Sequence, residues 1–128
     1  MVGAWLAIFV NSLLMCIPWM GFRFMNKRFG ALIGYSSFII FWLAFEYLHL
    51  QDWGLSWPWL TLGNVFAGKT DWVQWYEYTG TSGGSLWILS FNVLLYRIIR
   101  AGTDQKKIRQ RVSVVLILLL PLVISLLI

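Results

Sequence analysis

The last seventeen residues, VSVVLILLLPLVISLLI at positions 112–128, contain no charged side chain. A helix of about 20 apolar residues crosses the ~30 Å hydrocarbon core of a bilayer. Three more uncharged stretches of similar length precede it, at residues 1–22, 29–45 and 79–96. Four such helices leave no polar helical face for water, so the pattern predicts a membrane protein rather than a soluble helical core.

The composition of the whole chain agrees with this prediction. Its 128 residues are 59% hydrophobic and only 12% charged, whereas soluble domains carry about 25% charged residues. We therefore expect an all-α, polytopic transmembrane helix bundle occupying residues 1–128. The expected helices cover about 1–22, 29–50, 80–99 and 112–128, with a Trp-rich loop at about 51–79 and shorter loops at about 23–28 and 97–111.

The distribution of charge predicts the orientation. Nine of the ten Lys and Arg residues lie in or beside the two short loops, and only Lys69 lies in the long loop. Such an excess is typical of cytoplasmic loops. The short loops are thus expected in the cytoplasm, and the long loop and both ends outside it. Basic residues beside membrane spans normally meet lipid phosphates, so we expect membrane lipids and no nucleic acid as partners.

Both ends of the sequence resemble cut points. The first stretch has no basic residue before it, and its basic residues follow it. This order is the reverse of a secretory signal, in which the basic residues come first. The last stretch has no polar residue after it. We expect an earlier helix before Met1 and a further domain after residue 128.

Few side chains are candidates for chemistry. The single cysteine, Cys16, has no basic or positively charged helical neighbour of the kind that activates a catalytic thiol. The single histidine, His49, lies one turn after Glu46. Zinc sites normally use three or four protein ligands. We predict no metal, no cofactor and no catalytic residue here. Glu46 and His49 are expected to be a structural polar pair near the outer interface, or to contact the loop that follows.

The long loop contains most of the remaining information. It combines Trp and Tyr side chains with turn-forming glycines and Trp57-Pro58-Trp59, where proline restricts the backbone. An aromatic belt that anchors helix ends is one interpretation. The other is a lipid-facing surface where acyl chains or headgroups enter a site.

Three ordered motifs in and beside this loop resemble the membrane domain of apolipoprotein N-acyltransferases, in the form found in Bacteroidetes-type members. They are Glu46-Tyr47-Leu48-His49, then Trp57-Pro58-Trp59-Leu60 with Leu62-Gly63-Asn64, and then Gln74-Trp75-Tyr76-Glu77-Tyr78-Thr79-Gly80 with Gly83 and Asn92. The resemblance covers about residues 42–92. Two positions depart from it: His49, where many members have Arg, and Asn64, where an aromatic residue is common.

The resemblance implies an enzyme of the bacterial inner membrane. Such enzymes move an acyl chain from a phospholipid to the N-terminal diacylglyceryl-cysteine of a lipoprotein. They use a Cys nucleophile, a Glu general base and a Lys that stabilises the tetrahedral intermediate. In that family the three residues belong to a periplasmic nitrilase-like domain after the last helix. Residues 1–128 would be an anchor and a lipid-side wall, inactive alone. The resemblance implies that the lipid entry is lined by residues of its second and third motifs, with these candidates: Trp57, Pro58, Trp59, Gly63, Asn64, Gln74, Trp75, Glu77 and Gly80. The alternatives are a non-catalytic membrane scaffold or accessory subunit, and the membrane domain of a nitrilase-coupled polyprenol enzyme.

Overall fold

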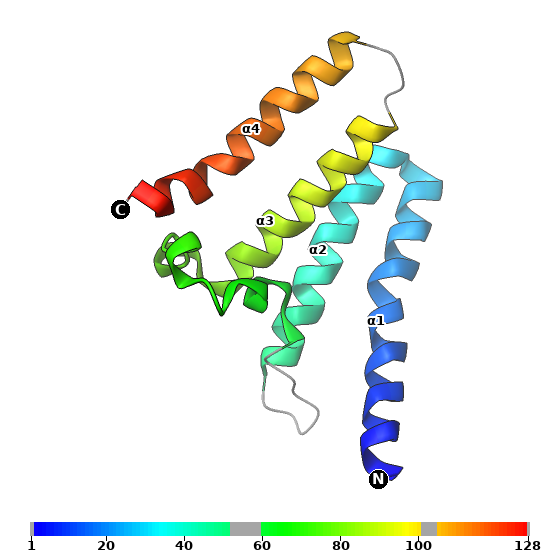
Figure 1. Cartoon of the computed structure of the whole chain (residues 1–128). Helices are drawn as coiled ribbons and strands as arrows, with labels where there is room; N and C mark the ends of the chain where they lie inside the picture. Colours follow the sequence, from blue (N-terminus) through cyan, green and yellow to red (C-terminus); the bar gives the residue numbers. More distant parts are fainter. Residues whose placement is uncertain (1, 52–59, 101–104, 128) are drawn as a thin grey trace. The chain divides into compact units, whose positions relative to one another are not determined.

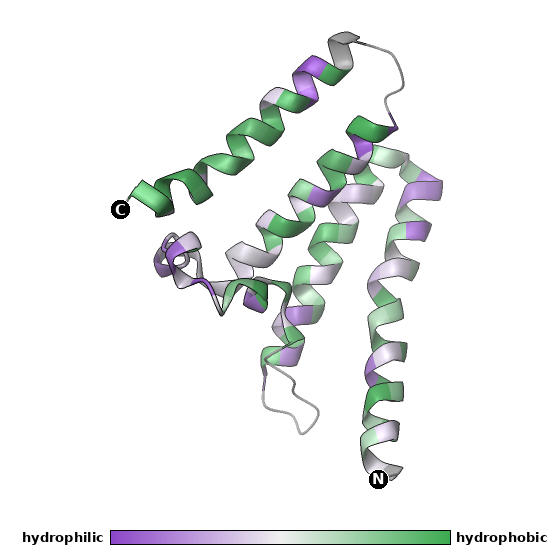
Figure 2. Cartoon of the chain, viewed as in Figure 1, coloured by the Kyte–Doolittle hydropathy of each residue, from purple (hydrophilic) through white to green (hydrophobic). Residues whose placement is uncertain are grey.

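The computed structural model describes residues 2–51, 60–100 and 105–127, with the side chains of residues 2 and 105–107 left aside. Trp57, Pro58 and Trp59 lie outside the described residues. The four long helices in these ranges are each long and apolar enough to cross a membrane, which confirms the predicted fold class. Figure 2 shows apolar residues along all four of them.

The first unit is a hairpin of two helices, α1 (Val2–Phe29) and α2 (Ala31–Leu50). Gly30, with φ of 86°, is the entire connection between them. Only glycine adopts this backbone conformation at low cost. The two helices lie side by side in Figure 1. Aromatic rings join them, with centroids 4.8 Å apart for Trp19 and Phe38 and 5.5 Å apart for Phe22 and Tyr35.

Helix α1 continues well past the predicted end at residue 22. Arg23, Lys27 and Arg28 belong to its last turns instead of forming a loop. Charged residues mark where an apolar stretch ends, but they are good helix formers and do not stop the backbone. The helix stops only at Gly30, so the predicted loop at 23–28 is helical.

The second unit contains two short 3₁₀ helices and two long helices. The 3₁₀ helices are η2 (Leu62–Phe66) and η3 (Thr70–Trp72), and the long helices are α3 (Tyr76–Ile99) and α4 (Gln105–Leu127). Figure 1 shows η2 and η3, in green, next to the start of α3. The Trp87 Nε1–H of α3 donates a hydrogen bond to the Leu118 carbonyl of α4, and the Arg111 guanidinium donates one to the Arg97 carbonyl.

Both long helices of this unit begin earlier than predicted. Helix α3 begins at Tyr76 instead of residue 80, with a kink at Gly80, where φ is 64° and ψ is −173°. Helix α4 begins at Gln105 instead of residue 112. As in α1, polar and charged residues extend a helix beyond its apolar stretch. The predicted loop at 97–111 is correspondingly shorter.

Candidate functional site

The backbone of η2 is held against α3 at Gly63. The Gly63 N–H donates a hydrogen bond to Ser85 Oγ at 2.9 Å, and the Tyr76 hydroxyl donates one to the Gly63 carbonyl at 3.1 Å. A Cβ atom at position 63 would lie 2.0 Å from the backbone oxygen of Thr81. Only a residue without a side chain allows this approach, and Ser85 beneath it is fully buried.

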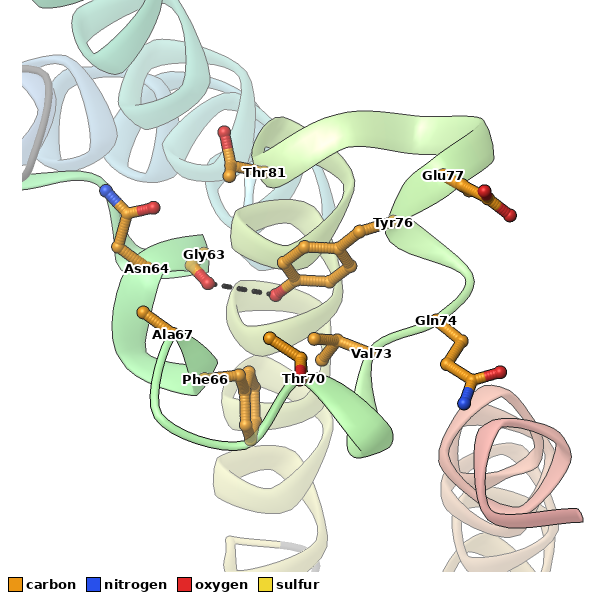
Figure 3. A pocket seen from close by; sticks show the side chains of 10 residues that line it. All are labelled: Gly63, Asn64, Phe66, Ala67, Thr70, Val73, Gln74, Tyr76, Glu77 and Thr81. Atoms are coloured by element: carbon orange, nitrogen blue, oxygen red, sulfur yellow. Dashed lines mark hydrogen bonds between the residues drawn. The ribbon is translucent and has the colours of Figure 1, made fainter. Parts of the chain in front are cut away.

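Two further glycines direct Tyr76 toward this contact. The left-handed conformation of Gly80 separates the first turn of α3 from the rest of the helix. A Cβ atom at Gly84 would lie 1.8 Å from the Tyr76 hydroxyl oxygen, so the tyrosine side chain packs directly against the helix backbone at this glycine. Figure 3 shows the Tyr76 ring directed at Gly63. The glycines therefore position the tyrosine that joins the start of α3 to η2.

A cavity of about 630 Å³ lies between η2, η3 and the start of α3. Ligand pockets in proteins commonly measure about 300–1,000 Å³. Its walls combine apolar side chains with amide, hydroxyl and carboxylate groups, and Glu77 is the one formal charge among the lining residues. Figure 3 shows the full lining, which is Gly63, Asn64, Phe66, Ala67, Thr70, Val73, Gln74, Tyr76, Glu77 and Thr81.

Four of the predicted site residues line this cavity, namely Gly63, Asn64, Gln74 and Glu77. They come from two separate motifs, ten residues apart, which the fold brings together. The Gln74 and Glu77 side chains extend away from the Tyr76–Gly63 contact in Figure 3, and both residues are exposed. They thus border the cavity on the side where solvent or lipid reaches it.

Trp75 and Gly80 were also predicted site residues, and both lie next to the cavity lining without being part of it. The Trp75 ring meets Tyr76 edge-on, with 4.8 Å between ring centroids, and it lies 6.5 Å from the Trp87 ring. Trp75 is therefore part of the packing behind the cavity and is absent from its lining. Gly80 provides the kink described above.

Several residues that are important here could not be identified from the sequence. Tyr76 lay inside a quoted motif, but its contact with Gly63 depends on the kink at Gly80. Ser85 had no sequence signal, since serines in membrane helices are usually packing residues. Phe66, Thr70 and Val73 line the cavity only because η2 and η3 fold back on α3.

Glu46 and His49 are buried in α2, at 4% and 5% exposure. The Trp42 Nε1–H donates a hydrogen bond to the Glu46 carboxylate at 3.0 Å, and His49 Nδ1 lies 3.0 Å from the Phe45 carbonyl oxygen. These contacts are made within the same helix. A direct contact between Glu46 and His49, or from either to the loop, stays a prediction.

The remaining candidates for chemistry are isolated. Cys16 is exposed on α1, with its sulfur 3.4 Å from the Ser12 carbonyl oxygen. Among the residues that the structure describes, no three His, Cys, Asp or Glu side chains come together as metal ligands would. The cavity beside α3 is therefore the feature of these residues that best fits a binding site.

Comparison with known proteins identifies one family. Residues 1–94 match the family described as the apolipoprotein N-acyltransferase N-terminal domain. The apolipoprotein N-acyltransferase of Chlorobaculum tepidum is 31% identical over 118 residues, which are 92% of this chain and 21% of that protein. The chain thus spans about a fifth of that relative's length. No solved structure matches the chain.

Proposed function

Because this chain belongs to the apolipoprotein N-acyltransferase family, we propose that it forms part of the membrane domain of an enzyme that acylates lipoproteins. The proposed reaction moves an acyl chain from a phospholipid to the α-amino group of an N-terminal diacylglyceryl-cysteine. We place the chain in the bacterial inner membrane, with residues 51–75 on the periplasmic side. The excess of Lys and Arg around the other helix ends supports this orientation.

The observation that carries the proposal is the cavity beside α3. Residues of two motifs that are separate in the sequence, Gly63-Asn64 and Gln74 to Glu77, line the same space. Its mixed walls suit the part of a phospholipid where polar and apolar groups meet. Phe66 and Val73 offer apolar contact, while Asn64 and Gln74 offer hydrogen bonds. We infer that this cavity lies on the path by which lipid reaches the reaction centre.

The chemistry of acyl transfer is assigned to residues outside this chain. A thiolate attacks the ester carbon of the phospholipid and releases a lysophospholipid, and the lipoprotein amine then displaces the thiol from the resulting thioester. Cys16 is a poor nucleophile for this step because its helical neighbours, Ser12, Leu13, Trp19 and Met20, include no base and no positive charge. Neither Cys16 nor Glu46 is assigned a catalytic role.

The test is to fill the cavity in the complete gene product without disturbing its supports. Ala67 lines the cavity and is exposed, so Ala67→Trp adds an indole ring there. Val65, in the helix η2 that ends directly before Ala67, is 70% exposed and is not part of the lining, so Val65→Trp is the matched control. Purified variants are assayed by mass spectrometry of the acylated lipoprotein. We expect Ala67→Trp to slow the reaction by about tenfold or more, a change of about 1.4 kcal/mol in the barrier.

Two results would overturn the proposal. Equal rates for Ala67→Trp and Val65→Trp, at equal protein levels, would remove the cavity from the lipid path. Absence of acyl transfer from the complete, folded wild-type protein would favour the scaffold alternative. Trp57→Ala and Trp59→Ala extend the test to the neighbouring loop, where unchanged acyl transfer would exclude these two side chains.

A further inference from the structure

The last two turns of α1 contain a basic patch, which consists of Arg23, Lys27 and Arg28. All three side chains are exposed, and all three residues belong to the helix rather than to a loop. Figure 2 shows hydrophilic residues gathered at this end of α1. Because the segment is helical, the three residues have fixed relative positions, and the basic patch is a defined surface.

The basic patch faces away from α2. At 3.6 residues per turn, successive residues are about 100° apart around the helix axis, so the patch covers about 140° of the circumference. Phe22 and Asn26 lie on the other side of α1, where the Phe22 ring stacks on Tyr35 and Asn26 lies against Gly34. The partner helix of the hairpin therefore leaves the patch uncovered.

The patch lies at the depth of lipid headgroups when the hairpin spans a membrane. The uncharged part of α1 before it, residues 2–22, is about 31 Å long at 1.5 Å per residue, which matches the ~30 Å hydrocarbon core. The headgroup region follows directly and adds about 5–7 Å on each side, so Arg23 and Lys27 are level with it or at its outer edge. The exposed rings of Phe24 and Phe29 offer apolar contact to lipid beside these charges. This depth is the same for either orientation of the hairpin.

No acidic side chain in the described part of the hairpin neutralises the patch. Among the described residues, Arg23 and Lys27 have no hydrogen-bond or ion-pair partner, and the Arg28 guanidinium lies over the Phe29 ring, 5.7 Å from its centroid. The single acid in residues 2–51, Glu46, lies near the far end of α2, and the first turn of α2 has no acidic residue. The C-terminus of α1 contributes only roughly half a negative charge, so most of the positive charge is uncompensated.

A protein segment that covers this patch would need an excess of acidic residues. The other strongly charged connection of the chain, residues 97–111, contains six basic residues and one acidic residue, so it repels the patch. Phosphate groups of lipids are the negative charges that occur at this depth of a bilayer. A headgroup with a net negative charge is favoured over a zwitterionic one, because the cation of the zwitterion opposes the patch.

We propose that the basic patch binds the headgroup of an anionic phospholipid. Arg23 and Lys27 are one helical turn apart, with Cβ atoms about 5–6 Å from each other, so the two side chains hold one phosphate group between them. The Arg23 guanidinium donates paired hydrogen bonds to phosphate oxygens, and the Lys27 ammonium adds a compact charge. Arg28 adds further attraction beside them. This site belongs to the hairpin alone and is independent of the acyl-transfer reaction and of the cavity beside α3.

The test is native mass spectrometry of the complete gene product, titrated with phosphatidylglycerol or with phosphatidylcholine. We expect tighter binding of phosphatidylglycerol, and about fivefold weaker binding in Lys27→Gln, the factor for about 1 kcal/mol per basic residue near a membrane surface. Lys69→Gln is the matched control, because it removes the same charge from an exposed lysine of the second unit. Arg23→Gln combined with Lys27→Gln should weaken binding about 25-fold, whereas Arg23→Lys, which keeps the charge, should weaken it less than Arg23→Gln does.

Three results would overturn the proposal. They are equal affinities for the two lipids, equal losses in Lys27→Gln and Lys69→Gln, and a photocrosslinker at position 27 that attaches to another protein segment instead of phosphatidylglycerol. Attachment of that crosslinker to phosphatidylglycerol, together with the selective loss in Lys27→Gln, supports it. None of these measurements depends on acyl transfer, so their outcome is separate from that of the cavity-filling test.

Discussion

Replacing Gly63 by alanine should release η2 from α3. The added Cβ would lie 2.0 Å from the Thr81 oxygen, 2.8 Å from its carbonyl carbon and 3.1 Å from its Cα. All three are backbone atoms of a helix, so the loop has to move instead. That movement breaks the bonds to Ser85 and from Tyr76, each contributing about 1 kcal/mol, and forced overpacking costs about 1–3 kcal/mol. We expect local destabilisation of about 3 kcal/mol.

Hydrogen exchange measures this effect locally. The Asn64 and Ala67 amides close the turns of η2, with bonds of 3.1 and 3.0 Å. A loss of about 3 kcal/mol corresponds to roughly hundredfold faster exchange of these two amides. Gly68→Ala is the control in the same loop, because a Cβ there meets nothing within 4 Å. Exchange in Gly63→Ala that equals exchange in Gly68→Ala would refute the close approach of η2 and α3.

Two other substitutions probe the same unit by thermal unfolding of the purified protein. Ser85→Ala leaves the loop N–H buried without its acceptor and should cost about 1–3 kcal/mol, while Ser82→Ala, at an exposed position of the same helix, should have no measurable effect. Equal midpoints for the two variants would contradict this bond. Trp87→Phe removes the hydrogen bond from α3 to α4 and should cost about 1 kcal/mol. Trp5→Phe, at a 71% exposed position, is its control, and a lower midpoint for the control than for Trp87→Phe would contradict the assignment.

The positions of the four helices could be predicted from the sequence, but their ends could not. The uncharged stretches located all four helices, since a membrane span needs a long apolar segment whatever its neighbours are. They did not locate the ends, because Arg23 to Arg28 and the polar residues before Ile108 continue the helical backbone beyond the apolar part. Gly30 and Gly80, both at positive φ, set the boundary and the kink.

The candidate site likewise contains some residues that could be predicted from the sequence and others that only the structure identified. The motif residues Gly63, Asn64, Gln74 and Glu77 were predicted from resemblance, and all four line the cavity. The roles of Tyr76 and Ser85 required tertiary structure. A hydrogen bond between residues 63 and 85 spans 22 positions of the sequence, and no local pattern encodes that pairing.

The sequence by itself determined that this chain is a helical membrane protein, because apolar length and charge act locally on each segment. Its motifs also indicated the family. Only the tertiary structure decided that η2 folds against α3 to enclose a cavity, and that Pro18, Gly21 and Ala44 leave a groove between α1 and α2. The first feature depends on the close approach of two backbones at Gly63, and the second on the Phe41 ring packing against Gly21. Each contact is a property of two segments together, so neither segment's sequence specifies it alone.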